Sequence, residues 1–206
     1  MNALLIIDIQ YDFLPGGALA VPHGDEIIAE INTYIHKFPL VVATQDWHPK
    51  DHLSFASMHS GRHPLELIDM NGMAQVLWPD HCIQGSHGAL FPETLTQGPV
   101  EAVFRKGLEP GIDSYSGFYD NGHKKSTGLA AYLKGKGVTE LVLVGLAGDY
   151  CVNYTAIDAL QEGFETSLIL SGIRSISESD FADCTGCLKI AGAKVFTDFN
   201  EYFYGA

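Results

Sequence analysis

The chain has few basic residues, few cysteines and no long hydrophobic run. Twelve lysines and arginines stand against 25 aspartates and glutamates, giving a formal net charge of −13. This balance argues against a nucleic-acid partner, which requires a basic face. No run of about 18 apolar residues occurs, so we expect no membrane span. The four cysteines follow no secretory leader, so we expect thiols rather than a disulfide framework, and a cytoplasmic location.

What is present suits one ordinary globular domain. A chain of 206 residues with a hydrophobic fraction of 46% can bury one sizeable core and is short for two. We therefore expect residues 1–206 to form a single domain. The segment from about residue 46 to 99 is long and rich in glycine, proline and histidine. Such segments usually carry function, and we expect this one to be a metal-binding loop insertion.

Short apolar runs alternate with helical patterns along the chain. We expect strands at Ala3–Ile9, Pro39–Gln45, Glu101–Arg105, Glu140–Leu146, Thr166–Ser171 and Ala193–Thr197. Most are apolar throughout, as in strands that are buried on both faces. We expect helices at Asp25–Lys37, Thr127–Lys136, Cys151–Glu162 and Ser177–Ala191. The alternation predicts a three-layer α/β fold, an open parallel sheet of about six strands with helices on both faces.

Reactive side chains follow four of the expected strands. Asp8, Asp46, Lys106 and Cys151 come at the carboxyl ends, where open parallel sheets bind ligands. Cys151 would open a helix, whose N-terminus favours a thiolate and can hold an oxyanion. A carboxylate can accept the thiol proton, and a lysine can keep that carboxylate ionised. The pattern predicts a cysteine nucleophile, although each residue alone also suits a structural role.

A second group of residues suits a metal ion. Asp46 and His48 lie two apart in an extended segment, so both side chains point the same way, and His81 follows in the same long segment. One carboxylate and two imidazoles suit Zn(II), Fe(II) or Mn(II) with open positions. His52 and Ser54 are further candidates for a fourth or water-bridged contact.

The other cysteines give weaker signals. Cys82 follows His81 in the long segment and is a second, less favoured candidate for the nucleophile. Cys184 and Cys187 form a single C-x-x-C pair inside an expected helix. One such pair is a weak zinc signal, and packing within the helix is the favoured interpretation.

Several motifs resemble cysteine hydrolases of the isochorismatase-like superfamily. The run Ile7–Phe13 is similar to their opening, and Gly145–Val152 is similar to their nucleophile turn. The nicotinamidase branch is suggested by Thr44–Pro49, Trp78–Cys82, Lys106–Gly107 and Asp113–Phe118. These motifs run in collinear order over most of the chain, and their combination is more specific than any one of them.

The resemblance implies an amidohydrolase that converts nicotinamide to nicotinate and ammonia through a cysteine thioester, in the salvage of NAD. It also implies deamidation of pyrazinamide. Cys151 would attack the carboxamide carbon, Asp8 would serve as base and then as acid, and Lys106 would complete the triad. The backbone N–H groups of Ala147 and Cys151 resemble the oxyanion hole of the family, in which a cis bond usually precedes the residue matching Ala147.

The resemblance also implies one divalent metal ion per chain, with zinc favoured over iron or manganese. Asp46, His48 and His81 would hold it, and its open position would take the pyridine nitrogen of nicotinamide. Some relatives add a fourth ligand nearby, which here leaves His52, Ser54 and the coordination number open. The pocket walls would be Phe13, Leu19 and Trp78, with Tyr115 a weaker candidate. A homo-oligomer remains an open alternative to a monomer.

Three other interpretations fit less well. Metal-free cysteine amidases and isochorismatase-type hydrolases lack the Asp-x-His pair and the second histidine. A non-haem iron oxygenase would carry His-x-Asp/Glu on a β-barrel, whereas this chain carries Asp-x-His on alternating strands and helices. A binding protein that has lost activity would rarely keep Asp8, Lys106 and Cys151 together.

Overall fold

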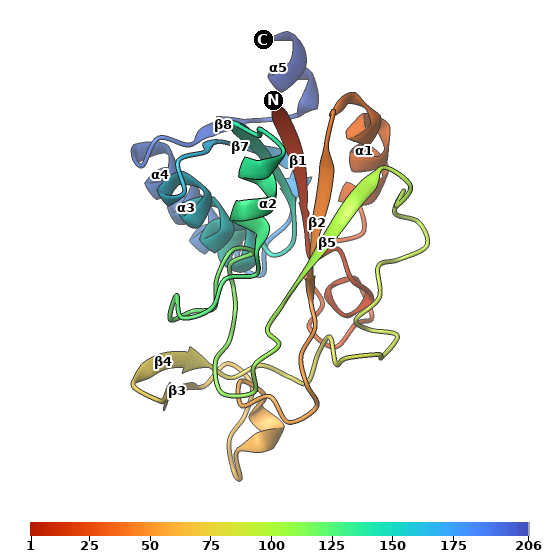
Figure 1. Cartoon of the computed structure of the whole chain (residues 1–206). Coiled ribbons are helices and arrows are strands. Elements are labelled where there is room, and N and C mark those ends of the chain that lie inside the picture. Colours follow the sequence, from red (N-terminus) through yellow and green to blue (C-terminus); the bar gives the residue numbers. More distant parts are fainter. Residues whose placement is uncertain (206) are drawn as a thin grey trace.

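A six-stranded parallel sheet forms the centre of the computed structural model, which describes residues 1–205 (Figure 1). The strands lie in the order β5-β2-β1-β6-β7-β8, and every neighbouring pair is parallel. All six expected strands and the α/β fold class are confirmed, with small shifts at the strand ends. The strands are β1 Asn2–Ile7, β2 Val41–Asp46, β5 Val100–Lys106, β6 Glu140–Gly145, β7 Glu165–Ile173 and β8 Lys194–Phe196.

Helices cover both faces of the sheet, which explains why the central strands are apolar throughout. Leu4 and Ile6 face one core with α1 (Ile27–Tyr34) and α5 (Phe199–Tyr204). Leu5 and Ile7 face the other, with α2 (Leu129–Gly135), α3 (Asn153–Gln161) and α4 (Glu178–Ile190). Four helices match the expectation. The helix α5 was not expected, and its first turn is capped by Asp198, whose side chain accepts from the backbone N–H of Glu201 at 2.9 Å.

Short helical turns complete the architecture. Among the described residues there are three 3-10 turns, η1 Tyr11–Phe13, η2 Ile35–Lys37 and η3 Ala56–Met58. The fourth turn, η4 Gly148–Val152, is a π-turn between β6 and α3. The expected helix from Cys151 to Glu162 is therefore regular only from Asn153 onward. Single π-turns occur often at functional sites.

The first part of the long segment between β2 and β5 lies at the carboxyl end of the sheet, away from both termini, and the last part runs back to the start of β5 (Figure 1). We expected little regular structure there. The structure instead contains an antiparallel hairpin, β3 Leu67–Met70 and β4 Met73–Val76. Its two-residue turn places Asn71 and Gly72 at φ 58° and 84°, the left-handed conformations that tight hairpins need.

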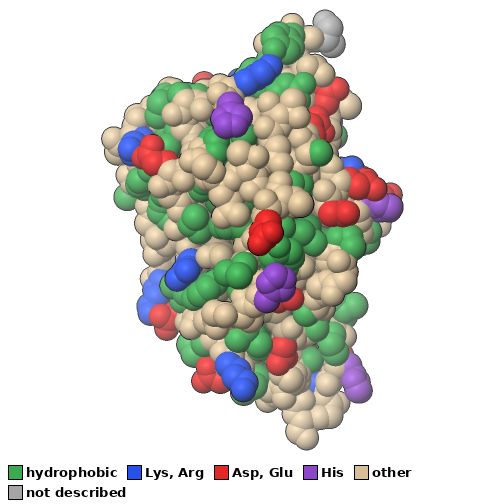
Figure 2. Space-filling view, turned by 90° about the vertical axis from the view of Figure 1, so that its right-hand side faces the viewer, with side chains coloured by type: hydrophobic (Ala, Val, Ile, Leu, Met, Phe, Trp, Pro, Cys, Tyr) green, Lys and Arg blue, Asp and Glu red, His purple; other side chains and the backbone are tan. Residues whose placement is uncertain are grey.

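The surface agrees with the charge balance. On the face seen in Figure 2, lysine and arginine side chains are scattered among acidic and hydrophobic ones and form no basic patch. Within residues 1–205, no helix is both long enough and apolar enough to cross a bilayer.

Candidate active site and metal site

Four adjacent strands bring the sequence-predicted residues together. Lys106 ends β5 and pairs in register with Asp46, which ends β2. Asp8 follows β1, and Cys151 lies in the π-turn after β6. The Lys106 Nζ lies 2.9 Å from Asp8 Oδ2 and 3.4 Å from Cys151 Sγ, and it also donates to Asp46 Oδ1. One ammonium thus contacts both the candidate base and a candidate metal ligand.

The charges of this group are buried and balanced against one another. Asp8 and Lys106 are 0% and 2% exposed. Burial alone would lower the pKa of Lys106, but the carboxylates of Asp46 and Asp8 raise it well above its usual value. Burial raises the pKa of Asp8, and the Lys106 ammonium opposes that rise. Lys106 therefore stays charged, and Asp8 becomes a stronger proton acceptor than an exposed aspartate.

The Cys151 thiol differs from the sequence-based expectation. We expected the helix start to favour a thiolate. Burial instead raises the pKa of this thiol well above its usual value, and the Lys106 charge offsets only part of that rise. Desolvation outweighs the stabilising charge of Lys106 because Cys151 is buried, with 7% of the residue exposed. A resting thiol needs a base, which the neighbouring Asp8 can supply.

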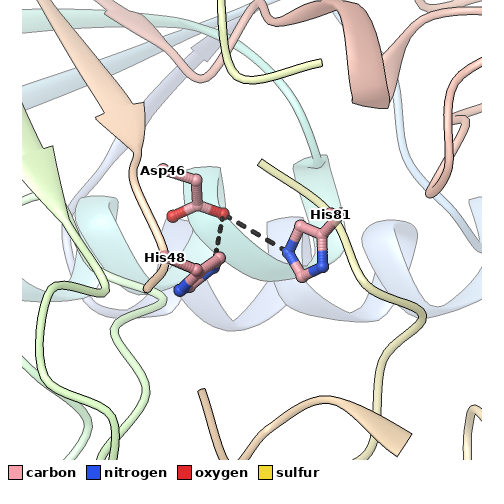
Figure 3. Close-up of side chains that lie close together, drawn as sticks. All are labelled: Asp46, His48 and His81. Carbon is pink, nitrogen blue, oxygen red and sulfur yellow. Dashed lines mark ion pairs between the residues drawn. The ribbon is translucent and has the colours of Figure 1, made fainter. Parts of the chain in front are cut away.

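Asp46, His48 and His81 form a compact donor set (Figure 3). Asp46 Oδ2 lies 3.6 Å from His48 Nε2 and 3.7 Å from His81 Nε2, and all three residues are buried. Burial would raise the pKa of Asp46, but Lys106 and His48 hold it well below its usual range. An ionised carboxylate facing two imidazole nitrogens is a donor set that suits a divalent metal ion.

Each histidine of this set is oriented by its other ring nitrogen. The Nδ1 of His48 lies 3.0 Å from the Gly107 carbonyl, and the Nδ1 of His81 lies 2.8 Å from the Pro79 carbonyl. Gly107 has φ 67°, and a Cβ there would meet the His48 ring at 2.3 Å. These bonds direct both Nε2 atoms toward Asp46, as in metal sites whose ligands are held by a second layer of hydrogen bonds.

The two candidates for a fourth contact interact with each other. The Nδ1 of His52 lies 2.7 Å from Ser54 Oγ, and its Nε2 lies 3.3 Å from the Ile112 carbonyl. Both nitrogens of His52 therefore have protein partners. Burial lowers the pKa of His52 to about 4, which keeps the ring neutral. The ligand atoms of His52, His48 and Asp113 lie within 4.8 Å of one another, but His52 is outside the set formed with Asp46 and His81.

A narrow cavity joins the two groups. Its lining includes Cys151 and Ala147 together with Asp46 and His81. The expected oxyanion-hole residue Ala147 follows a cis peptide bond after Leu146, as the resemblance implied. The walls are the expected Phe13, Leu19, Trp78 and Tyr115, together with Asp113, Tyr150 and Ile176, which the sequence analysis did not name as pocket residues.

Polar residues that the sequence analysis missed hold the site in place. Thr44 Oγ1 donates to Asp8 Oδ1 at 2.7 Å. Gln10 Nε2 donates to the Asp46 carbonyl, and the Asp46 N–H donates back to Gln10 Oε1, both at 2.8 Å. For Thr44 a signal was available, because Thr44 and Asp46 lie two apart on β2 and share a face. Gln10 gave no such signal, because it follows β1 and Asp8 before it has φ 48°.

The remaining cysteines do not join this group. Cys82 is buried, and its backbone N–H donates to Asp12 Oδ2 at 2.7 Å. Burial raises the pKa of the Cys82 thiol well above its usual value, with the Asp46 and Asp12 charges adding to the rise. Cys184 and Cys187 lie on α4, as expected. Cys151, unlike Cys82, lines the cavity and lies within contact of Lys106.

Comparisons with known proteins agree with this geometry. The family model described as the isochorismatase domain matches residues 2–197. The nicotinamidase of Escherichia coli (strain K12) is 44% identical over 202 residues, covering 95% of this chain and 94% of that protein. A solved nicotinamidase–pyrazinamidase of Acinetobacter baumanii superimposes with a TM-score of 0.92 at 41% identity, covering 95% of each chain. The pyrazinamidase of Pyrococcus horikoshii in complex with zinc gives 0.79 at 38% identity, covering 96% of this chain and 99% of that one.

Proposed function

This chain belongs to the isochorismatase family, and from that premise we propose that it hydrolyses nicotinamide to nicotinate and ammonia. The proposal rests on one observation, which is that a single cavity connects a cysteine cluster with a set of candidate metal-binding side chains. Asp8, Lys106 and Cys151 form one group, and Asp46 with the two histidines forms the other. A carboxamide on a pyridine ring needs both a nucleophile for the carbonyl carbon and a partner for the ring nitrogen.

Cys151 is the proposed nucleophile. Its sulfur attacks the carboxamide carbon while its proton passes to the Asp8 carboxylate. The backbone N–H groups of Ala147 and Cys151 are proposed to hold the oxyanion that forms on the carbonyl oxygen. Asp8 then donates the proton to the departing amine, which leaves as ammonia, and a thioester to Cys151 remains.

Water completes the reaction. Asp8 accepts a proton from a water molecule, whose oxygen attacks the thioester carbon. The carbon–sulfur bond breaks, Asp8 returns its proton to the Cys151 sulfur, and the acid product releases its remaining proton to solvent and leaves as nicotinate. Lys106 stays charged throughout, because the two carboxylates hold its pKa well above its usual value. It keeps Asp8 able to alternate between base and acid.

Asp46, His48 and His81 are proposed to hold one divalent metal ion. The fit rests on the ionised buried carboxylate and on two imidazoles whose Nδ1 atoms are already engaged by backbone carbonyls. A bound zinc, iron or manganese ion would supply an open position for the pyridine nitrogen. Zinc is the favoured ion, because the Pyrococcus horikoshii pyrazinamidase was solved in complex with zinc. Phe13, Leu19 and Trp78 would enclose the ring, and pyrazinamide, with a ring nitrogen in the same place, is a proposed second substrate.

Ammonia release tests the proposal. Purified protein loaded with zinc should release ammonia from nicotinamide and far less from benzamide, which has the amide but no ring nitrogen. The rival function, general cysteine amidase activity, requires comparable rates on both amides. Equal rates would show that the donor set does not orient the substrate.

A further inference from the structure

Gln75 is a buried polar residue on a hairpin that is otherwise largely solvent-facing. It lies on β4 within the insertion and is 2% exposed, whereas its neighbour Ala74 is exposed. A buried amide group is costly unless it is hydrogen-bonded. The buried amide of Gln75 therefore requires hydrogen-bond partners, and these partners indicate the role of the hairpin.

The Gln75 amide contacts the segment that lines the cavity. Its two N–H groups have three acceptors within reach, which are the Val76 carbonyl at 2.8 Å, Asp113 Oδ2 at 2.9 Å and the Tyr115 hydroxyl at 3.1 Å. The other oxygen of Asp113 accepts from the Ser114 N–H at 2.8 Å. The Ser114 carbonyl in turn accepts from Lys106 Nζ at 3.0 Å. One amide thus holds both ends of the short segment 113–115, whose middle residue contacts Lys106.

Tyr115 is the cavity-lining residue that the Gln75 amide contacts. Its ring lies 5.5 Å from the Tyr150 ring and 6.3 Å from the Trp78 ring, and all three line the cavity with Cys151. Burial and the Asp113 carboxylate raise the pKa of Tyr115, so its hydroxyl keeps its proton. Residues 113–115 belong to no helix or strand, so backbone ladders do not fix this wall.

We propose that Gln75 is a positioning residue for substrate binding, which sets the width of the cavity through Tyr115 and Asp113. The inference rests on the proposed hydrolysis of nicotinamide and adds the hairpin to the substrate-recognition apparatus. Without the amide donor, one buried oxygen of Asp113 loses a partner, and the Tyr115 hydroxyl loses its contact with the hairpin. The contacts of Lys106 with Asp8, Asp46 and Cys151 do not involve this segment, so binding of the substrate changes more than the chemical step.

Gln75→Met tests the inference, because methionine has a similar length but no amide donor. Two hydrogen bonds are lost, so we expect KM for nicotinamide to rise about tenfold while kcat changes little. A wider aromatic amide, such as a quinoline carboxamide, should gain relative to nicotinamide in kcat/KM. Gln97→Met is the matched control, because Gln97 is an exposed residue of the same insertion.

Two outcomes overturn the inference. One is an unchanged KM and an unchanged preference for nicotinamide in folded Gln75→Met. The other is a fall in kcat alone that follows a lowered melting temperature, as expected of a purely structural residue. Should Gln75→Met fail to fold, Tyr115→Phe removes only the hydroxyl that Gln75 contacts, and its KM must rise. Wild-type protein that releases no ammonia would instead refute the proposed function itself.

Discussion

The sheet edge and the insertion build the candidate site in different ways. Asp8, Lys106 and Cys151 stand at or just beyond the ends of paired strands that are packed between two apolar cores. His81 and Trp78 stand on irregular backbone of the insertion, whose own segments are paired by isolated bridges such as His48 with Ile83 and Phe55 with Trp78. The sheet edge holds the residues of the proposed chemical step, and the insertion holds residues proposed to bind the substrate. Changes in the two halves should therefore affect different kinetic constants.

The largest effect is expected at the sheet edge. Cys151→Ala removes the proposed nucleophile and should lower kcat by about 10⁴-fold or more. The melting temperature should change little, because a small side chain replaces another at an edge of the core. Ammonia release and thermal unfolding measure the two quantities. If Cys151→Ala keeps its activity and Cys82→Ala loses it, the nucleophile lies in the insertion and not at the sheet edge.

Asp8→Asn should lower kcat by about 10²–10⁴-fold, because the amide cannot accept the thiol proton. Alkylation of Cys151 at neutral pH should slow in parallel, and an unchanged alkylation rate would show that Asp8 does not activate the thiol.

The pH dependence of kcat/KM in the wild type also tests Asp8 as the base. Burial raises the pKa of Asp8 above 3.8, so its carboxylate is lost at a higher pH than that of an exposed aspartate. We expect kcat/KM to fall as the pH decreases through this raised pKa, since the protonated form accepts no proton. A profile that stays flat down to pH 3.8 would contradict the assignment of Asp8 as base.

A change in the insertion should act mainly on substrate binding. His81→Ala removes one of the proposed ligands, and we expect KM for nicotinamide to rise about 10–100-fold, with a smaller fall in kcat. Metal content measured alongside should fall. A loss of kcat with KM unchanged would assign His81 to the chemical step. It would contradict the assignment of substrate recognition to the insertion.

The smallest effect is expected outside both halves. Cys187 is exposed on α4, and Cys187→Ser should change stability by less than about 0.5 kcal/mol and leave the kinetic constants unaltered. Ammonia release and thermal unfolding again provide the measurement. A marked loss of activity would reveal a role for the C-x-x-C pair that the geometry does not show.

The sheet was predictable because its inner strands β1, β2 and β6 are short runs buried on both sides, and the edge strands β5 and β8 are shorter or partly exposed segments in the same alternation with helices. The Asp8, Asp46, Lys106 and Cys151 cluster followed from the rule that parallel strands present their carboxyl ends at one edge. The hairpin β3–β4 was missed although the Asn71-Gly72 pair is a strong hairpin signal. Its strands have only four residues each, too few for a clear alternating pattern.

Other features could not be predicted because they depend on tertiary contacts. The thiol pKa of Cys151 is set by burial, which a helix-start argument ignores. The role of Gln75 depends on Asp113 and Tyr115, which lie far along the chain and reach it only in the folded state. α5 was missed although Asp198 and Glu201 have the spacing of a helix cap, because the helix is only six residues long.

The position of Lys106 between two carboxylates limits how such an enzyme can be redesigned. Its ammonium contacts Asp8 on one side and Asp46 on the other, so one positive charge serves two anions. A designer who removed Asp46 to make a metal-free amidase would also strengthen the pull of the lysine on Asp8 and weaken that residue as a base. A designer who removed the lysine would leave two buried anions that favour sharing a proton. Conversion between the two kinds of amidase therefore demands coordinated substitutions at all three positions, and a route through single changes passes through impaired intermediates.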